Sequence, residues 1–515
     1  MSRKQYFTSA LPTAGLNYSE PGISISERHT PDCSEVRMGV GLVEKTPGSK
    51  VFSGTVDTPL NGTVMALNYV NSVLICHTTT KVYSLVAGTF TDETDAGGPF
   101  TGTILNPVSS IWMYDSSATK NYYIFANGIE QPRKWDQSTA LVELLANTAT
   151  KIPDWIAQYG SRLCMYNVTD GGTDFPKRVR WSAVSKPEDH SSSGSGFADL
   201  YAQLSDDTSI VRAEKLGDNM IIYGDHSMAI QQYTQATLYP FAFYAAVPTT
   251  GLAAPRALLN IHNREHLFLG WDDVYMYRGE LGVERVGGVI RDELFDIIDP
   301  DNIETSFMVY IGNEDRARLH IPQVGSSVPD VYFEFNLKEK SWTKGARTYS
   351  GYGEYQVTTT EDWDGDSETW DDDLSSWNSA TTVKGFPLFL YGNDSGEVHQ
   401  YPSNNYSLIG TAISAHWDTK DFTPDEYRKV MSTWLTLQFE ASGNTVDVSY
   451  STDAGISFTD LETVTLTDDL AMYRVDLDVH SSQIRFRFAN NTADETFKLR
   501  WFEVGYVPGS EWYRS

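Results

Sequence analysis

The chain of 515 residues has little cysteine, little basic charge and no long apolar run. Its three cysteines, Cys33, Cys76 and Cys164, are widely spaced, and their odd number argues against a disulfide framework. The 39 Lys and Arg are outnumbered by 68 Asp and Glu, and the net charge of −29 argues against a protein that grips nucleic acid through clustered cations. No stretch approaches the roughly 18 apolar residues of a membrane span, and no secretory signal begins the chain. We therefore expect a soluble protein of a reducing cytoplasm without a membrane span.

Catalytic signatures are scarce as well. The ten histidines show neither His-x-His nor His-Glu-x-x-His spacing, and there is no Gly-x-Ser-x-Gly elbow and no P-loop. Ser451–Phe458 (STDAGISF) matches the Asp-box turn of sialidases, but only one copy is present. That motif is structural, because its Asp caps a tight turn and its Gly supplies a positive φ. The sequence therefore predicts no catalytic residue, no cofactor and no enzyme activity.

One acidic run qualifies as a candidate cation site. Asp362, Asp364 and Asp366 (DWDGD) resemble the start of a calcium loop, whose carboxylate oxygens are the ligands that Ca²⁺ prefers. The EF-hand pattern requires glycine at its sixth position, and here Gly365 stands at the fourth. A solvated acidic loop is the simpler interpretation, and the cation site is kept as the alternative.

The chain is rich in strand-like sequence that repeats. Seven times, an apolar or aromatic run of about four residues is followed by a polar or glycine turn and a second strand-like run. The copies begin at Ser72, Tyr122, Arg162, Asn219, His266, Arg316 and Pro387. Such spacing is typical of radially repeated sheets, each of which buries one face only by stacking on the next. The sixth copy is interrupted by the loop GSSVP, so six and seven blades both remain open.

The predicted fold class is all-β, in three regions. They are an extended N-terminal arm (residues 1–60), a β-propeller of six or seven blades (residues 61–405) and a C-terminal β-sandwich (residues 406–515). The sandwich is predicted from long alternating strands such as Thr445–Ser451. Apolar spacing predicts one short helix at Arg291–Ile298. Gly62–Asn68 is a candidate for the strand that closes the propeller against its last blade.

A tryptophan- and aspartate-rich insertion occupies residues 358–380. Trp363, Trp370 and Trp377 are seven residues apart, and each is followed by Asp or Asn. Clustered Gly, Asp, Ser and Asn are poor helix formers, so we expect a ribbon of short turns rather than a helix. Each indole is then a candidate for anchoring the ribbon on the surface or for contacting a partner.

One ordered set of short segments resembles a known family. The set comprises Ala14–Asn17, Pro21–Gly22, Glu35–Arg37, Glu44–Gly48, Arg178–Ser182 (RVRWS), Pro187–His190, Gly194–Phe197, Asp199–Leu200, Gly217–Tyr223, Gly251–Arg256 (GLAAPR) and the insertion before Gly385–Tyr401. In this order they are similar to tailed-bacteriophage propeller proteins of the tail-nozzle and head–tail (packaged DNA) stabilisation type. His190 stands where the family pattern has an aromatic residue. The resemblance covers the N-terminus and most of the predicted propeller.

The resemblance implies a structural virion protein of the phage tail, assembled in the cytoplasm of the host bacterium. Family members form a ring, here a homo-hexamer, below the portal and the adaptor or head–tail connector protein. Tail fibre, spike or needle proteins attach to such a ring. The genomic DNA is retained by it and then passes through its lumen without sequence-specific binding. The acidity of this chain suits a channel to which DNA does not adhere, although acidity also simply keeps a large surface soluble.

Two other functions are left open by the residues. The first is a receptor- or carbohydrate-binding tail propeller, in which Trp363, Trp370 and Trp377 stack on sugars. The second is a glycosidase, suggested by the single Asp-box turn and weakened because paired catalytic carboxylates cannot be singled out among 68 acidic residues.

Overall fold

The computed structural model describes most of the chain and is almost entirely β. The described residues are 5–9, 11, 13–39, 41–52, 59–86, 88–95, 99–138, 141–206, 208–279, 282–312, 314–356, 387–402, 405–423, 430–439, 444–467 and 470–508. Within them the one α-helix is α1 (Arg291–Ile297), as its apolar spacing predicted, and a 3₁₀ turn, η2, covers Ile303–Thr305. Neither has the length or apolarity to cross a bilayer.

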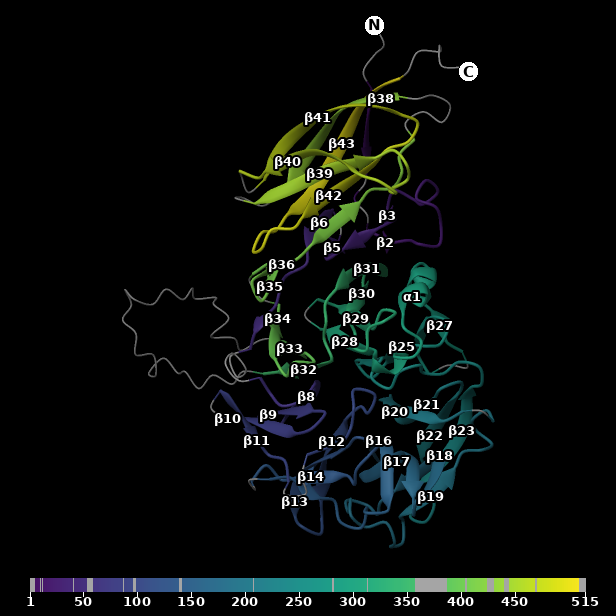
Figure 1. The fold of residues 1–515 in the computed structure, drawn as a ribbon. Coiled ribbons are helices and arrows are strands. Elements are labelled where there is room, and N and C mark those ends of the chain that lie inside the picture. Colours follow the sequence, from purple (N-terminus) through teal and green to yellow (C-terminus); the bar gives the residue numbers. More distant parts are fainter. Residues whose placement is uncertain are drawn as a thin grey trace.

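Five antiparallel four-stranded sheets follow one another along the described part of residues 64–285 (Figure 1). In each, the strands pair in the order of the sequence, as a meander of hairpins does. Their strands are β8 (Val64–Val70), β9 (Val73–Thr78), β10 (Val82–Val86) and β11 (Thr89–Asp92); β12 (Ser109–Asp115), β13 (Lys120–Ala126), β14 (Arg133–Trp135) and β15 (Glu143–Leu144); β16 (Lys151–Tyr159), β17 (Arg162–Asp170), β18 (Thr173–Trp181) and β19 (Gly196–Asp199); β20 (Ile210–Leu216), β21 (Asn219–Gly224), β22 (Met228–Tyr233) and β23 (Phe241–Val247); and β24 (Leu258–Ile261), β25 (Glu265–Leu269), β26 (Val274–Tyr277) and β27 (Glu284–Arg285).

The next two sheets are extended by strands from the beginning of the chain. The sixth consists of β28 (Phe307–Ile311), β29 (Arg316–Ile321), β30 (Val331–Asn336) and β31 (Ser341–Ala346), followed by β2 (Gly15–Leu16) and β3 (His29–Thr30). The seventh consists of β32 (Gly351–Tyr355), β33 (Leu388–Gly392), β34 (Val398–Tyr401) and β7 (Lys50–Val51). Segments far apart in the sequence thus share one sheet.

The first strands of these seven sheets surround one central cavity. β8, β12, β16, β20, β24, β28 and β32 all contribute to its wall, and its volume is about 680 Å³. The last sheet meets the first where the Ser350 hydroxyl donates to the carbonyl of Val64 at 2.7 Å. Gly351 and Gly353 allow this approach, because a Cβ on either would collide with the backbone of β8. The arrangement is propeller-like.

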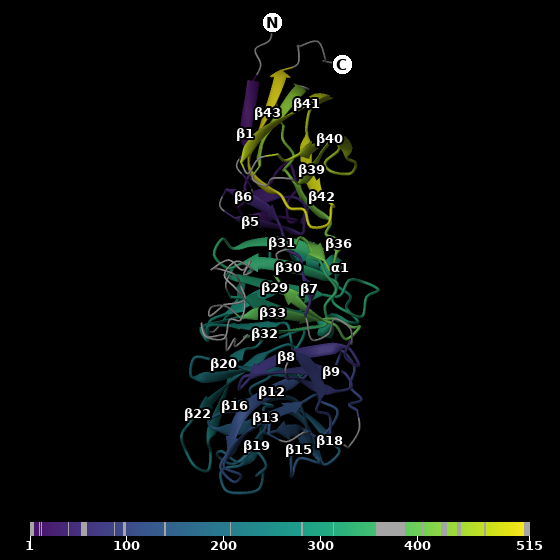
Figure 2. The ribbon, with the colours of Figure 1, turned by 90° about the vertical axis from the view of Figure 1, so that its left-hand side faces the viewer.

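Two further sheets follow at one end of the elongated molecule (Figure 2). One contains β41 (Ala471–Ser481), β38 (Val430–Phe439), β43 (Lys498–Pro508), β6 (Leu42–Lys45) and β5 (Val36–Gly39), with β1 (Gln5–Ser9) also paired to β43. The other contains β4 (Cys33–Ser34), β37 (Ala415–Asp418), β42 (Arg485–Asn490), β39 (Thr445–Ser451) and β40 (Thr459–Thr465). A small ribbon of β35 (Ser407–Leu408) and β36 (Thr411–Ala412) precedes them.

Side-chain patterns explain how the sheets pack. Along β41, Val475, Leu477 and Val479 are buried and alternate with exposed residues, so one face meets the core and the other meets water. Every residue of β30 is buried, because other parts of the protein cover both of its faces. One cluster of buried apolar side chains runs from the sixth sheet, for example Phe333, into both C-terminal sheets, for example Phe488. The propeller-like body and the C-terminal sheets therefore share a core.

The N-terminal residues up to Val51 supply strands to four different sheets. β1, β5 and β6 join one C-terminal sheet, and β4 joins the other. β2 and β3 extend the sixth sheet of the propeller-like body, and β7 completes the seventh. This segment therefore ties the two parts of the molecule together.

The strand pairing decides two details of the sequence-based interpretation. The closing strand is not Gly62–Asn68, because β8 pairs with β9 in its own sheet, whereas β7 pairs with β34. The interruption of the sixth copy by GSSVP left open that its two halves are edge strands, but β29 pairs with both β28 and β30, and β30 pairs with both β29 and β31. The GSSVP loop merely lengthens the connection between two central strands.

Candidate functional site

The side chains singled out in the insertion lie outside the described residues. Asp362, Asp364 and Asp366, the candidate cation ligands, and Trp363, Trp370 and Trp377, the candidate contact residues, all fall within residues 357–386, which the structure does not describe. Among the residues that it does describe, no group of three or more His, Cys, Asp or Glu is placed to hold a metal ion. The three cysteines are buried with free thiols.

The Asp-box turn has the structural role predicted for it. The Asp453 carboxylate accepts hydrogen bonds from the Ser451 hydroxyl at 2.6 Å and from the backbone N–H of Ser457 at 3.0 Å. These bonds, that from Ser451 first, lower the pKa of Asp453 to about 2. Gly455 has a φ of 89°, and the Phe458 ring packs under the Arg487 guanidinium at 3.9 Å. The turn is thus an anchored corner of its sheet.

Arg178, the first residue of the RVRWS segment, locks two strands together. Its Nε and Nη2 donate to the two carboxylate oxygens of Asp199 at 2.8 and 2.9 Å, which joins β18 to β19. Its guanidinium carbon lies 3.5 Å from the ring centre of Phe175 and 4.2 Å from that of Phe197. Bidentate pairing combined with stacking requires the planar group of arginine. Both Arg178 and Asp199 belong to the segments that carry the family resemblance.

The same sheet contains Trp181 at the end of β18, and the connection from β18 to β19 contains Ser182 and His190. The Trp181 ring meets Phe241 of the next sheet edge-on, with 5.3 Å between ring centres. The Ser182 hydroxyl accepts from the backbone N–H of Leu163 at 3.0 Å. Burial, followed by the charge of Arg180, lowers the pKa of His190 to about 4, so this ring is neutral at pH 7. The buried imidazole is therefore an uncharged ring.

Arg256, the last residue of the GLAAPR segment, reaches between the first and the last of the seven sheets. Its Nη1 donates to the carbonyls of Met65 on β8 and Ser350 next to β32, at 3.1 and 2.5 Å. Its Nη2 donates to the carbonyl of Thr305 at 2.9 Å. The guanidinium therefore links the first sheet, the last sheet and the segment before the sixth through backbone acceptors.

A buried ionic cluster fixes the N-terminal segment to the sixth sheet. Glu35, just before β5, accepts from Arg347 Nη2 at 2.7 Å and from the Tyr332 hydroxyl at 3.0 Å. Nearby, Glu334 pairs with both Arg316 and Arg318 at 2.6 Å. Burial alone would raise the pKa of Glu334, but the guanidinium groups of Arg318, Arg316 and Arg37 outweigh it and hold that pKa well below its usual range.

Arg37 extends this cluster to the seventh sheet. It pairs with Glu314 at 2.5 Å and donates to the hydroxyl of Tyr401 on β34. Arg318 donates to the same hydroxyl at 2.5 Å. Sequence reasoning identified Glu35–Arg37 only through the resemblance and did not predict its partners. Charges within otherwise apolar strands, RARLHI and VYFEFN, were the available signal for buried ion pairs.

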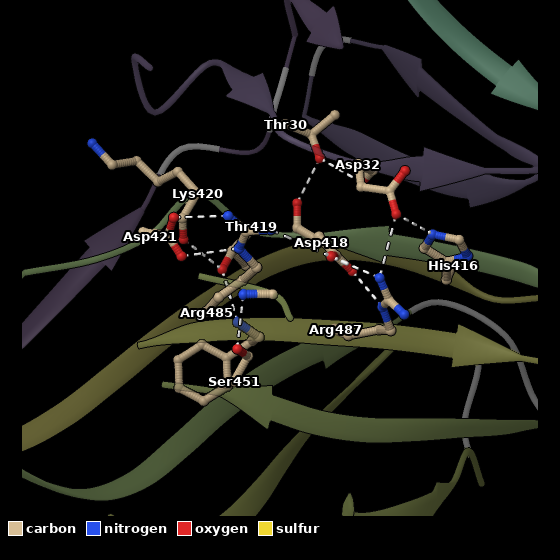
Figure 3. A network of polar contacts seen from close by, with 12 residues as sticks. Thr30, Asp32, His416, Asp418, Thr419, Lys420, Asp421, Ser451, Arg485 and Arg487 are labelled. Atoms are coloured by element: carbon tan, nitrogen blue, oxygen red, sulfur yellow. Dashed lines mark hydrogen bonds and ion pairs between the residues drawn. The ribbon is translucent and has the colours of Figure 1, made fainter. Parts of the chain in front are cut away.

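A second polar network joins the N-terminal segment to the C-terminal sheets (Figure 3). Asp32 pairs with His416 at 3.0 Å and with Arg487 at 3.3 Å, and Asp418 holds Arg487 at 2.6 and 2.8 Å. The Thr30 hydroxyl donates to the backbone carbonyl of Asp418 at 2.6 Å. Burial raises the pKa of Asp32, but the hydrogen bond from His416 and the charges of His416 and Arg487 outweigh it and lower that pKa.

The bidentate pair of Asp421 and Arg485, at 2.9 and 2.7 Å, continues the same network. Arg485 lies on β42, whereas Asp421 follows β37, so the pair links the end of one strand to its neighbour. Both side chains are almost fully buried. The network is therefore a structural joint of paired charges, and its arginines are occupied by carboxylates of the same chain.

Comparisons with known proteins give no family for this chain. No known family and no curated protein matches it. Among solved structures, the computationally designed Ika8 protein is 8% identical, with a TM-score of 0.34, and the match covers 69% of this chain and 100% of that one. An exo-β-1,3-galactanase from Phanerochaete chrysosporium, with galactose, is 10% identical, with a TM-score of 0.27, and the match covers 89% and 99%.

Proposed function

We propose that the seven sheets are the blades of one β-propeller and that the two C-terminal sheets form a β-sandwich attached to the sixth blade. The support for seven blades is the single cavity to which the first strand of every sheet contributes. The close approach of β32 to β8 at Gly351 and Gly353 supports closure between the last blade and the first. The apolar cluster common to both C-terminal sheets supports the sandwich.

We further propose that the protein is a structural component of a bacteriophage tail, a nozzle that forms an oligomeric channel below the portal and adaptor. The observation that carries this proposal is the position of the residues on which the resemblance rests. Arg178 and Asp199 hold two strands of a blade together, Arg256 links the first and last blades, and Glu35 and Arg37 bind the N-terminal segment to the body. A tail component must withstand the pressure of packaged DNA. Residues that join strands, blades and the N-terminal segment would give the protein the rigidity that this role requires.

The charge of the chain agrees with a conducting role. A ring of six copies would carry six times the net charge of −29, and most of it must face water or the lumen because buried unpaired charges are costly. Such a wall would repel the phosphates of passing DNA and keep the DNA from adhering. The partners of this function are further copies of the chain, the adaptor or head–tail connector, fibre, spike or needle proteins, and the genomic DNA. The protein would be located in the virion tail.

The test is assembly. Negative-stain microscopy of the purified chain is expected to show rings, and heads that carry portal and adaptor should bind it and protect their DNA better against added nuclease. Heads without adaptor are the matched control and should gain no protection. A strictly monomeric chain that neither binds adaptor-bearing heads nor occurs in tails would overturn the proposal. In that case, binding on a glycan array that is lost in W363A, W370A or W377A would favour a carbohydrate-binding propeller, and hydrolysis of a surface polysaccharide would favour a glycosidase.

A further inference from the structure

The central cavity carries a charge opposite to that of the protein as a whole. Its wall includes three basic side chains, Arg212, Lys215 and Arg256, and two acidic ones, Glu214 and Glu354, which leaves an excess of one positive charge. The whole chain has a net charge of −29. A local excess of cations in an acidic protein is a feature that needs a physical explanation, and a bound anion would supply one.

Arg256 is the origin of that excess. All its hydrogen-bond acceptors are backbone carbonyls, and among the described residues no carboxylate forms an ion pair with it. Its Nε is buried without a partner. Burial lowers the pKa of this guanidinium to about 10, which leaves it charged at neutral pH. The three carbonyls and the Phe307 ring, 5.5 Å from the guanidinium carbon, replace part of the lost hydration, but no carboxylate balances the charge, and a buried unbalanced charge is unfavourable.

Arg212 places a second guanidinium beside the same stretch of backbone. Its Nη1 donates to the carbonyls of Pro255 and Leu258 at 3.0 and 3.2 Å, on either side of Arg256. Its Nη2 pairs with Glu214 at 2.6 Å, and its guanidinium lies over Trp155 at 4.8 Å. Glu214 therefore neutralises Arg212 and leaves the charge of Arg256 uncompensated. The Nε of Arg212 is also buried without a partner.

The remaining two charges of the wall are available to act on a ligand. Lys215 is exposed, follows Glu214 on β20 and forms no ion pair among the described residues. Glu354 lies on β32, and burial raises the pKa of its carboxyl group. An anion in the cavity would be attracted by Lys215 and repelled by Glu354.

We propose that the central cavity binds one small oxyanion, a phosphate- or carboxylate-bearing molecule, which provides the counter-charge that Arg256 lacks. Arg212 and Lys215 add to the attraction, and Glu354 limits it. The volume of about 680 Å³ is large enough for a small organic acid or phosphate ester and lies within the usual range of small-ligand pockets. The site lies in a single chain, so it does not depend on ring assembly or on the proposed tail function.

The experiment is a calorimetric titration of the intact chain, in a buffer without phosphate or carboxylate, with inorganic phosphate and separately with citrate. We expect one site per chain and competition between the two anions; binding of one anion alone would assign the site to its class. K215M should weaken binding by about fivefold and E354Q should strengthen it by a similar factor, because each changes one charge of the wall. K186M, which removes an exposed lysine outside the cavity, is the matched control and should bind as the unmodified chain does.

Among the described residues, the side chains changed in these variants form no hydrogen bond or ion pair. We therefore expect each variant to fold as the unmodified chain does. Absence of saturable binding of either anion at tens of millimolar would overturn the proposal. So would binding that neither K215M nor E354Q alters, because the anion would then lie elsewhere on the protein. A ring that assembles normally but binds neither anion would refute this site while leaving the tail function intact.

Discussion

Glu35 and Arg347 are 312 residues apart in the sequence, yet their buried side chains form an ion pair in which Nη2 lies 2.7 Å from Oε2. Glu35 has a positive φ of 51°, and its Oε1 also accepts from the backbone N–H of Ala346 at 3.0 Å. One carboxylate thus holds the start of β5 against the end of β31. The pair is one of the places where the N-terminal segment is attached to the propeller-like body.

Breaking this pair is expected to be costly. E35Q keeps the size of the side chain but leaves the Arg347 charge buried and unpaired, and we expect a loss of about 3–5 kcal/mol in the free energy of unfolding. The double variant E35Q/R347M should recover part of that loss, because it removes both charges. Urea denaturation measures both. R474M is the control, because its ion pair with Asp476 is largely exposed and worth less than about 1 kcal/mol. An E35Q loss no larger than that of R474M would contradict the assignment.

The proposed closure between the last and first sheets is tested at Gly353. In G353A the new methyl group would overlap the backbone carbonyl of Leu67, and we expect a destabilisation of about 3 kcal/mol or more. G288A is the matched control, because a Cβ there meets no atom within 4 Å and the residue has no positive φ. Thermal unfolding of the two variants side by side decides the matter. Equal melting temperatures would show that β32 and β8 are not packed as described.

Replacing Arg178 by lysine should lower the free energy of unfolding. R178K retains the charge but loses the bidentate pairing with Asp199 and the stacking on Phe175 and Phe197, and we expect a loss of about 1–2 kcal/mol. R285K, which alters an exposed arginine paired with Asp272, should cost much less. Chemical denaturation provides the comparison. If R178K were as stable as R285K, the planar geometry at this position would be unimportant.

His190 is expected to shape the stability of the protein in acid. Its folded-state pKa of about 4 lies below the ordinary value of 6.5, so the unfolded chain takes up a proton first as the pH falls. The contribution of neutral His190 to the free energy of unfolding is therefore complete above pH 6.5. It is lost progressively as the pH falls toward 4, and about 2 kcal/mol is lost at pH 5. H190F removes this titration and keeps a ring at the position. Free energies of unfolding between pH 4 and 7 should fall less steeply in H190F, and identical slopes would refute the prediction.

Periodic sequence predicted the local elements well. Thr445–Ser451 was predicted as a strand and is β39 without change of bounds, and α1 ends one residue before the predicted Ile298. Apolar alternation and turn residues act over a few neighbours, so they are visible in a single segment. Each of the seven repeated phrases likewise begins within or next to a strand of a different sheet.

Long-range relationships were beyond this kind of reasoning. β7 has two residues, Lys50 and Val51, which carry no periodic signal, and its pairing with β34 depends on partners that fold far along the chain. Gly62–Asn68 was a candidate for the closing strand because propellers often pair an N-terminal strand with the last blade, and this general rule does not say which N-terminal strand is used. The carbonyl acceptors of Arg256 lie up to 191 residues away and have no side-chain signature at all. The candidate residues of the insertion could not be compared with the structure, since residues 357–386 lie outside its described part.

The placement of β7 has a consequence for synthesis on the ribosome. β7 is translated before almost the whole propeller-like body, whereas its partner β34 emerges only after the first six sheets. The same delay applies to β2 and β3, which wait for β31, and to β5 and β6, which wait for β43. β2 and β3 pair with each other, as do β5 and β6, but one edge of each pair stays open until its later partner is made, at a stage when bare strand edges favour aggregation. We therefore expect the early strands to join their sheets only late in synthesis, after the later partner strands have been made.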